Sequence, residues 1–251
     1  MKKTKNSYKK YKSLSRQEAA LLNAVEPLIV FSPLEIKRLS GWKSSRISNT
    51  LFTLKRKKVI LHLQKNKYIL SEKVPQNLFL AATTLTAPSY ISFWTASSYY
   101  GLTEQQVSAI QVISTKQYPN FKIGTTKVEV TKVDPKRFFG YAKIQNFALA
   151  EKEKLILDCL HWPEKAGSID ELRKIISSAW PSIERGKLQE YLIKFRNKSL
   201  FARLGYLLEE LKLPFPEKFF LRNIPKGFVP LNPSLKPSKK YNQKWKVNIN
   251  D

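Results

Sequence analysis

Three short helical stretches in close succession are the feature that most constrains the N-terminal part of this chain. Two of them begin with a Ser-x-x-Glu pattern, at residues 15–18 and 32–35, in which the serine and the glutamate cap each other's backbone N–H groups. Pro33 suits the first position of the second helix because it has no N–H group to leave unpaired. Gly41 ends that helix, and a third helix is expected over about residues 44–58.

The segment that follows, residues 59–70, reads VILHLQKNKYIL and predicts two short strands around a turn at residues 64–66. Within the third helix, Ile47, Leu51 and Leu54 recur at a spacing that places them on one side, where they would pack on the first two helices. Three helices followed by a hairpin is the order of a winged helix-turn-helix, a fold whose third helix enters the major groove of DNA.

The side chains expected on the exposed side of the third helix are short and polar or basic: Ser44, Ser45, Arg46, Ser48, Asn49, Thr53 and Arg56. Short side chains allow close approach to a base pair, and Arg46 can bond guanine while Asn49 can bond adenine. A second set is expected to contact phosphates from the helix ends and the hairpin: Lys43, Lys57, Lys58, Lys65 and Lys67. We therefore predict that this module binds double-stranded DNA, as a monomer or as a homodimer.

The balance of charge favours a polyanionic partner. The chain has 45 Lys and Arg against 19 Asp and Glu, a formal net charge of +26, and its first 75 residues hold 18 basic and 4 acidic residues. A surplus of this size attracts nucleic acid. Two plainer interpretations stay open, because basic residues in the last turn of a helix also favour its dipole, and because some winged helices bind proteins.

Composition and pattern divide the chain into three regions. Residues 1–13 form a basic tail, residues 14–74 form the winged helix-turn-helix, and residues 75–251 form a second domain that begins near Pro75. In the second domain, helical and strand-like stretches mix without strict alternation. The pattern therefore predicts an α+β fold.

Two parts of the second domain carry specific expectations. Residues 89–102, SYISFWTASSYYGL, are expected to form an apolar helix that ends at Gly101. Its aromatic side chains could stack on bases, but their helical spacing favours a core face. Near the C-terminus, short strands are expected within residues 228–231 and 244–249.

Signals for catalysis are sparse. The chain has two histidines, and it contains no H-E-x-x-H motif, Walker A loop or G-x-S-x-G motif. Asp158, Cys159 and His161 lie close together on one expected helix, but Cys159 continues an apolar face and favours packing over metal binding. The sequence therefore predicts no catalytic residue, no metal ligand, no cofactor and no enzymatic activity.

Two further functions stay open as alternatives. Asp134 and Lys136 resemble the acid-x-Lys end of a restriction-type nuclease core, although Glu129 lies too close to serve as its upstream metal ligand. A metal-dependent nuclease is therefore one alternative. An RNA- or ribosome-associated basic protein is the other, since the charge alone does not separate it from a DNA-binding protein.

The remaining features concern location. The single cysteine, Cys159, excludes an internal disulfide, and no stretch approaches the eighteen uninterrupted apolar residues of a membrane span. The N-terminal residues lack the apolar core of a secretory signal. These features predict a cytoplasmic protein with no membrane partner.

Four stretches of the second domain carry a family resemblance. They are YISFWTASSYYGLTEQQ (90–106), EKEKLILDCLHWPEKAG (151–167), ARLGYLLEEL (202–211) and FVPLNPSLKPSKKYNQKWKVNIN (228–250). In this order they resemble the AbiEi antitoxin family of transcriptional regulators from bacterial and archaeal defence loci. The resemblance covers nearly the whole chain, and one departure is Leu155, where the family's motif has threonine.

The resemblance implies a two-domain protein without catalytic activity. Its winged helix would repress the antitoxin's own operon by binding the promoter. Its C-terminal domain would counter a nucleotidyltransferase-like toxin, AbiEii, in a type IV toxin–antitoxin system with an antiviral role. In such systems the antitoxin and the toxin need not form a stable complex.

Overall fold

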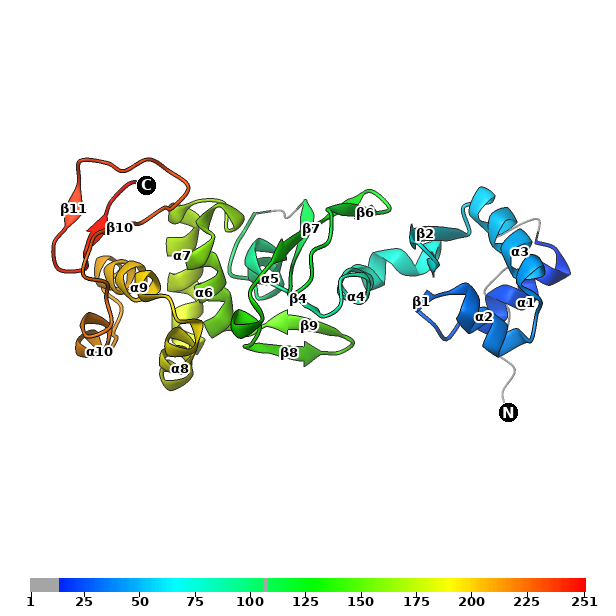
Figure 1. Cartoon of the computed structure of the whole chain (residues 1–251), viewed down its shortest axis with the longest axis horizontal. Coiled ribbons are helices and arrows are strands. Elements are labelled where there is room, and N and C mark those ends of the chain that lie inside the picture. The colour runs from blue at the N-terminus through cyan, green and yellow to red at the C-terminus, as the bar shows by residue number, and fades with distance from the viewer. Residues whose placement is uncertain (1–13, 106–107) are drawn as a thin grey trace. The chain divides into compact units, whose positions relative to one another are not determined.

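The computed structural model describes residues 14–105 and 108–251 of the chain. The basic tail predicted at residues 1–13 lies outside this part. Helices and strands are intermixed along the chain, which confirms the predicted α+β class (Figure 1). Within the described residues, no helix is long and apolar enough to cross a membrane.

The chain forms two compact units, and each is continuous in space but not in sequence. The first unit comprises Met1–Leu85 together with Phe121–Lys127. The second unit comprises Thr86–Asn120 and Val128–Asp251. A short hairpin segment from the middle of the chain therefore belongs to the first unit.

The observed boundary differs from the one predicted after residue 74. Helix α4 (Val74–Leu85) belongs to the first unit, where it packs against strand β6 (Phe121–Ile123). A one-turn 3-10 helix, Ser71–Lys73, leads directly into α4. The composition of this segment gives no sign of that packing, since β6 lies about forty residues further along the chain than the end of α4.

Three helices open the first unit: α1 (Arg16–Val25), α2 (Pro33–Ser40) and α3 (Ser44–Arg56). The capping box predicted at the start of α1 is confirmed. The Ser15 hydroxyl accepts from the backbone N–H of Glu18 at 3.2 Å, and the Glu18 carboxylate accepts from the backbone N–H of Ser15 at 2.7 Å. These bonds satisfy N–H groups that have no partner inside the helix.

Helix α2 begins and ends where its sequence predicts, but only half of its capping box forms, because the Glu35 carboxylate accepts from the Ser32 hydroxyl at 2.6 Å and not from the backbone N–H of Ser32. The Ser32 hydroxyl accepts from the backbone N–H of Glu35 at 3.3 Å, and Pro33 fills the first helical position. Gly41 follows the last residue with φ of 68°, a left-handed conformation that glycine adopts without a Cβ clash. The short turn after Gly41 leads into α3.

A three-stranded antiparallel sheet completes the first unit, with strand order β1-β3-β2. The hairpin expected from residues 59–70 is confirmed as β2 (Ile60–Gln64) and β3 (Lys67–Leu70), which pair antiparallel. Asn66 forms the turn with φ of 58°, a conformation that asparagine tolerates well. Strand β1 (Val30–Phe31) was not expected, because two residues carry no periodic signal.

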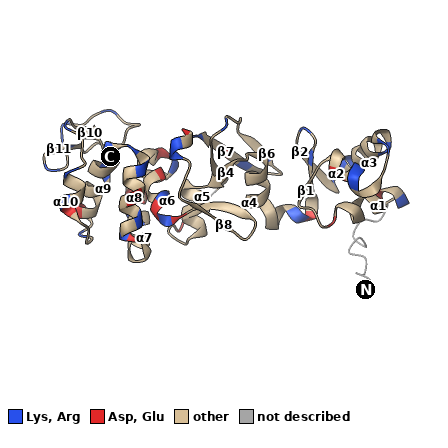
Figure 2. Ribbon diagram, turned by 60° about the horizontal axis from the view of Figure 1, so that its bottom comes forward, with Lys and Arg blue, Asp and Glu red and all other residues tan. Residues whose placement is uncertain are grey.

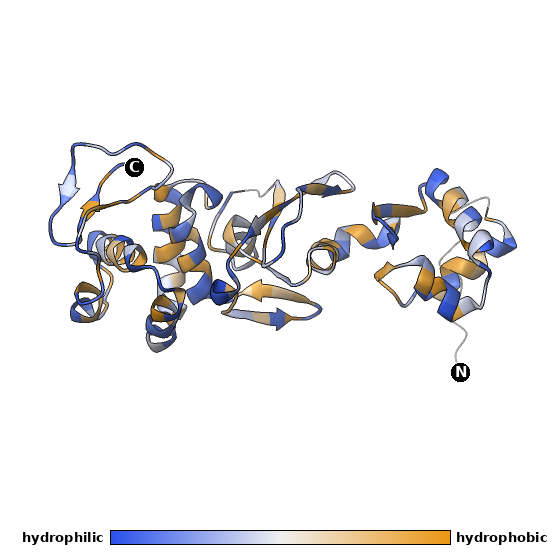
Figure 3. Ribbon diagram, in the orientation of Figure 1, coloured by the Kyte–Doolittle hydropathy of each residue, from blue (hydrophilic) through white to orange (hydrophobic). Residues whose placement is uncertain are grey.

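The core of the first unit is shared by all of these elements. Ile47, Leu51 and Leu54 are buried on the inner side of α3, as their spacing predicts. The same cluster takes in side chains from α1, α2 and the sheet: Leu21, Leu22, Val25, Phe31, Ile36, Val59, Ile60 and Leu70. Figure 3 shows how apolar residues recur along one side of these helices. Each fully buried Leu or Ile contributes about 1.5–3 kcal/mol, which fixes the orientation of α3.

The second unit contains most of a six-stranded sheet with strand order β6-β7-β5-β4-β9-β8. Beyond β6, the strands are β4 (Ser89–Ile91), β5 (Ala109–Ser114), β7 (Thr126–Lys132), β8 (Tyr141–Ile144) and β9 (Phe147–Ala150). The central strand β4 runs antiparallel to β5 and parallel to β9. The helix expected over residues 89–102 is therefore wrong in its first part, because Ser89, Tyr90 and Ile91 are buried at the centre of the sheet.

Six helices of the described chain belong to the second unit: α5 (Phe93–Tyr99), α6 (Lys152–His161), α7 (Ile169–Ala179), α8 (Arg185–Phe195), α9 (Lys198–Glu210) and α10 (Glu217–Leu221). Helix α6 packs against α5, α7, α8 and α9, and each residue from Glu153 to Leu160 is buried. It is therefore the central helix of this unit.

A small sheet near the C-terminus packs on α9. Its strands are β10 (Val229–Pro230), β11 (Tyr241–Asn242) and β12 (Val247–Asn248), in the order β10-β12-β11. The strands expected near residues 228–231 and 244–249 are thus confirmed, although each is shorter than its expected range. Trp245 lies fully buried over Gly205 of α9, where a Cβ atom would collide with the indole ring.

Candidate nucleic-acid interface

Helix α3 presents one continuous exposed stripe opposite its buried side. With 3.6 residues per turn, Ser45, Asn49, Phe52 and Arg56 follow one another at steps of three or four and lie farthest from the apolar side. All four side chains are exposed. Three of the four belong to the predicted base-reading set, so the stripe is the part of α3 best placed to reach a groove.

Arg46 and Thr53, also predicted to read bases, lie to one side of this stripe. Arg46 is exposed, and its guanidinium stacks on the ring of Trp42 at 3.8 Å from the centroid. The Thr53 hydroxyl donates to the carbonyl of Thr50 at 3.0 Å and also bonds the carboxylate of Glu18 in α1. Thr53 is exposed although its hydroxyl bonds α1, and the Arg46 guanidinium is held by an aromatic neighbour.

Glu18 also holds one of the predicted phosphate-contacting lysines. The Lys57 ammonium lies 2.7 Å from the Glu18 carboxylate, whose side chain is only 5% exposed. Burial raises the pKa of Glu18, but hydrogen bonds from Lys57, from the Ser15 backbone and from Thr53 outweigh it and lower the pKa overall. Lys57 is therefore tied to α1 in this structure.

The other predicted residues of α3 and its ends are open to solvent. Ser44, Ser48, Lys43 and Lys58 are exposed, and Lys43 precedes the helix without a capping side chain. On the hairpin, Lys65 is exposed at the turn and Lys67 is half-buried at the start of β3. Figure 2 shows the Lys and Arg residues of α3 and of the β2–β3 hairpin.

Phe52 is the residue of this surface that sequence reasoning missed. Its side chain is 62% exposed in the middle of the polar stripe, and the Arg56 guanidinium lies 5.9 Å from its ring centroid. Its place within a polar stripe gives α3 one apolar contact group beside Asn49 and Arg56. The sequence could have indicated this position, because Phe52 lies three residues after Asn49 and four before Arg56, on the opposite side of the helix from Leu54.

The three residues considered as metal ligands, Asp158, Cys159 and His161, lie in different surroundings. Asp158 accepts from Ser92 at 2.8 Å and from Tyr90 at 3.1 Å, and it pairs with Lys154 one turn away. Burial raises the pKa of Asp158 and lowers that of Lys154, and each charge offsets part of the effect on the other. Within the described residues, no group of His, Cys, Asp and Glu side chains could hold a metal ion.

Cys159 is fully buried and His161 is half-buried, and both side chains pack within the second unit. Burial raises the pKa of the Cys159 thiol well above its usual value. Burial, together with the charges of Arg137, Arg203 and Lys154, lowers the pKa of His161 to about 4, so its ring is neutral near pH 7. The Asp158–Cys159–His161 group is therefore part of the fold of α6.

The nuclease-like residues Asp134 and Lys136 also have a local structural role. The Asp134 carboxylate accepts from the backbone N–H of Lys136 at 2.8 Å and caps the short 3-10 helix Pro135–Arg137. This arrangement is common where an aspartate precedes a proline turn. It accounts for both residue types without a metal.

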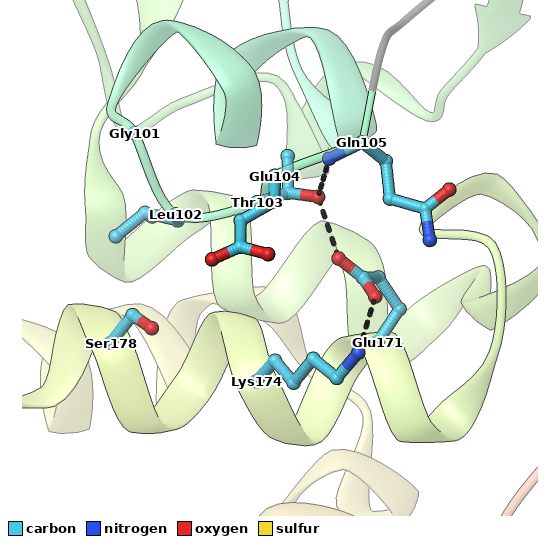
Figure 4. A pocket seen from close by; sticks show the side chains of 8 residues that line it. All are labelled: Gly101, Leu102, Thr103, Glu104, Gln105, Glu171, Lys174 and Ser178. Atoms are coloured by element: carbon cyan, nitrogen blue, oxygen red, sulfur yellow. Dashed lines mark hydrogen bonds and ion pairs between the residues drawn. The ribbon is translucent and has the colours of Figure 1, made fainter.

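A cavity of about 360 Å³ lies beside α7 in the second unit (Figure 4). Two acidic residues, Glu104 and Glu171, line it, and Glu171 is hydrogen-bonded to Thr103 at 2.6 Å and lies 3.5 Å from the ammonium of Lys174. The Thr103 hydroxyl in turn accepts from the backbone N–H of Gln105 at 3.2 Å. These contacts fix the loop after α5 against α7, which explains the polar lining as a loop anchor.

Comparison with known proteins adds one structural likeness. No family model matches the chain, and no curated protein matches it. The crystal structure of the Rv2827c protein from Mycobacterium tuberculosis superposes with a TM-score of 0.67, over 94% of this chain and 92% of that chain, at 11% sequence identity. At this identity the two proteins share a fold over nearly their whole lengths.

Proposed function

We propose that the first unit is a winged helix-turn-helix that binds double-stranded DNA, with α3 as the recognition helix and the β2–β3 hairpin as the wing. The order of its elements and its three-stranded sheet support this fold. In this arrangement the stripe of Ser45, Asn49, Phe52 and Arg56 meets base edges. Lys65 and Lys67 meet phosphates beside the groove.

The observation that carries the proposal is the charge of this segment. Residues 36–71 contain ten Lys and Arg and no Asp or Glu. Polar side chains short enough for close approach stand within this positive field, on a helix whose opposite side is fixed by a buried core. Phosphate neutralisation would supply affinity, and base contacts from α3 would supply sequence choice.

We further propose that the whole chain is an AbiEi-type antitoxin that represses its own operon and counters an AbiEii-type nucleotidyltransferase toxin, without a required stable complex. The motif residues that carry the resemblance support this reading by their structural roles. Lys154 and Asp158 form the buried pair of α6, and Trp245 packs over Gly205. Such a repressor acts in the cytoplasm, where its operator DNA lies.

The proposal is tested by binding of the full-length protein to the DNA upstream of its own gene, with a scrambled duplex of equal length as control. We expect tighter binding to the upstream DNA at about 0.15 M salt, and log K that falls with log salt by about 0.9 for each phosphate neutralised. Equal affinity for both duplexes would remove the repressor role. A slope near zero would remove the proposed interface.

A further inference from the structure

A second basic segment lies in the second unit, around the C-terminal sheet of β10, β11 and β12. Residues 218–250 contain eight Lys and Arg and no Asp or Glu. Lys244 is neutralised by Glu209 at 2.7 Å and Glu217 at 3.1 Å. Six others are exposed and form no ion pair with any described residue: Lys218, Arg222, Lys226, Lys236, Lys239 and Lys240.

Two aromatic rings stand exposed within this positive surface. Phe228 is 42% exposed and Tyr241 is 48% exposed, and their ring centroids lie 5.0 Å apart at an interplanar angle of 73°. The Lys246 ammonium lies 5.1 Å from the centroid of the Phe228 ring. The sheet buries Val247 and Trp245. The exposed ring pair is therefore not part of the hydrophobic core.

The register of the strands explains why the three side chains meet. Val229 pairs with Val247 in parallel, which sets Phe228 beside Lys246. Tyr241 pairs with Asn248 on the other side of β12, two residues beyond Lys246. Phe228 directly precedes β10, and Lys246, with φ of 54°, directly precedes β12, so the pairing of these strands brings the two side chains together at the strand starts.

The segment that carries Lys236, Lys239 and Lys240 is held in place by two asparagines. The Asn248 amide donates to the carbonyls of Ser238 at 2.8 Å and Lys240 at 3.1 Å. The Asn250 amide donates to the carbonyls of Asn232, Leu235 and Lys236, at 2.8, 3.1 and 3.3 Å. A surface already ordered in this way loses less conformational freedom when it binds.

We propose that this surface, the Phe228–Tyr241 platform, binds single-stranded nucleic acid. Bases stack on the two rings. The backbone phosphates lie against Lys246 and against the lysines of the segment that Asn248 and Asn250 hold in place. Duplex DNA fits the rings less well, because its bases are already stacked on one another. An acidic peptide would meet the lysines but would leave the ring faces unused. This site is separate from the proposed duplex-binding surface of the first unit.

The test compares three probes with the full-length protein by fluorescence anisotropy: a dT12 strand, a 12-mer of abasic deoxyribose phosphates, and a 12-base-pair duplex of scrambled sequence. The first two carry the same charge, so any preference between them comes from the bases. We expect the wild type to prefer dT12 over the abasic strand at least fivefold. The double variant Phe228→Ala, Tyr241→Ala should lose that preference and keep its affinity for the duplex.

Two further variants separate stacking from other effects. Tyr99→Ala removes an equally exposed ring, 42% exposed on α5, and should leave the preference for dT12 intact. Phe228→Leu with Tyr241→Leu keeps an apolar surface without rings. This variant should lose the preference for dT12 while its circular dichroism spectrum is unchanged. An rU12 strand shows whether RNA is bound as well as DNA.

The proposal is overturned if the wild type binds dT12 and the abasic strand equally, or if the leucine variant keeps the preference. A loss that Tyr99→Ala shares to the same degree would overturn it too. Failure of the duplex-binding proposal is a separate result, because that appears as equal affinity for upstream and scrambled duplexes.

Discussion

Two acid-free basic segments, residues 36–71 and 218–250, carry similar positive charge but surround it with different side chains. On α3 the exposed neighbours of the basic residues are Ser, Asn, Thr and a single Phe, all on one convex helix. Around the C-terminal sheet they are two rings in contact, beside loops that asparagines hold in place. Charge alone would assign both segments the same ligand.

The difference lies in what each surface can offer a base. A helix with short side chains fits a groove and reads the edges of paired bases. Exposed rings offer a face on which only an unpaired base can stack. We therefore infer that the two segments divide duplex and single-stranded binding between them. The following predictions would break or sharpen that division.

The largest effect is expected from Lys154→Met in α6. It leaves Asp158 buried without its charged partner, and such a loss costs about 3–5 kcal/mol of folding free energy. Because α6 packs on α9, and α9 carries the C-terminal sheet, single-strand binding should weaken while upstream duplex binding persists. The stability of each unit is measured by chemical denaturation of protein labelled with 5-fluorotryptophan and followed by fluorine NMR. Of the five Trp residues only Trp42 lies in the first unit, so its signal reports that unit and the other four report the second.

Lys174→Met is the matched control for that variant. Lys174 also lies in the second unit, but its side chain is 70% exposed and its loss should change stability little. The double variant Lys154→Met, Asp158→Leu removes both charges and should be less destabilised than Lys154→Met alone. If Lys154→Met lowers the denaturation midpoint of the Trp42 signal as much as the midpoints of the other Trp signals, the two units do not unfold independently.

The next effect concerns sequence choice by α3. Asn49→Ala and Arg56→Ala should each cost about 1–3 kcal/mol on the preferred duplex and relax choice at one base position. Arg46→Ala should cost less at the bases, since its guanidinium is held over Trp42. Competition binding with a library of single-base operator variants measures the change at each position.

Lys65→Ala on the hairpin is the control for these base contacts. It should weaken binding to every duplex alike and reduce the salt slope by about 0.9. If Asn49→Ala also weakens all duplexes equally, α3 does not read bases. In that case the two basic segments would differ less than their side chains indicate.

The elements of the first unit could be predicted from sequence because their signals are local. Helix caps, the spacing of Ile47, Leu51 and Leu54, and the hairpin turn each lie within a few residues. Residues 89–91 were predicted as helix but form β4. A strand buried on both faces is apolar throughout, and its sequence looks like part of a buried helix. Strands β8 and β9 were missed for want of a strong alternating pattern.

The candidate sites depend more on contacts that sequence does not show. Thr53 is exposed, as its place on α3 predicts, but the bond of its hydroxyl to Glu18 depends on how α1 packs against α3. The Phe228–Tyr241 platform joins the residue before β10 to the first residue of β11, and β12, which pairs with both strands, sets their register. Pairing of this kind follows from tertiary structure, so no local pattern could indicate it.

A smaller effect is expected from Glu18→Gln, which breaks the link between α1 and Lys57. The pKa of Glu18 is lowered in the fold, so its contribution to stability is present above the unfolded pKa and is lost as pH falls through the folded value. We expect a loss of about 1 kcal/mol at pH 7 that shrinks as the pH falls through the lowered pKa of Glu18, measured by urea denaturation of the Trp42 fluorine signal.

Glu26→Gln provides the comparison, because Glu26 lies at the end of α1 and its side chain is 56% exposed. It should change stability little at any pH. Release of Lys57 by Glu18→Gln should also strengthen duplex binding slightly and leave the preference for dT12 unchanged. A destabilisation that stays constant from pH 7 to pH 3 would show that the carboxylate charge is not its cause.

The smallest effect, and the sharpest test of the division, concerns Phe52. Its exposed ring lies between Asn49 and Arg56, where an apolar side chain can contact the 5-methyl group of thymine in the major groove. Burial of one methyl group is worth about 0.8 kcal/mol, or about fourfold in affinity. Replacement of the contacted thymine by uracil should therefore weaken the wild type about fourfold and leave Phe52→Ala unaffected.

The experiment replaces each thymine of the preferred duplex by uracil in turn and measures both proteins, so that each position gives a complete double-mutant cycle. One position should show coupling, because the ring and the methyl group lose the same contact. Phe52→Leu should keep part of the discrimination, since a leucine side chain still covers a methyl group. The Phe228 and Tyr241 rings bind a base by its face, so loss of the methyl group should matter far less there, and dU12 should bind nearly as well as dT12. Coupling at no thymine would show that Phe52 contacts no thymine methyl group, and sedimentation at rising concentration would then test whether Phe52 contacts a second copy of the chain.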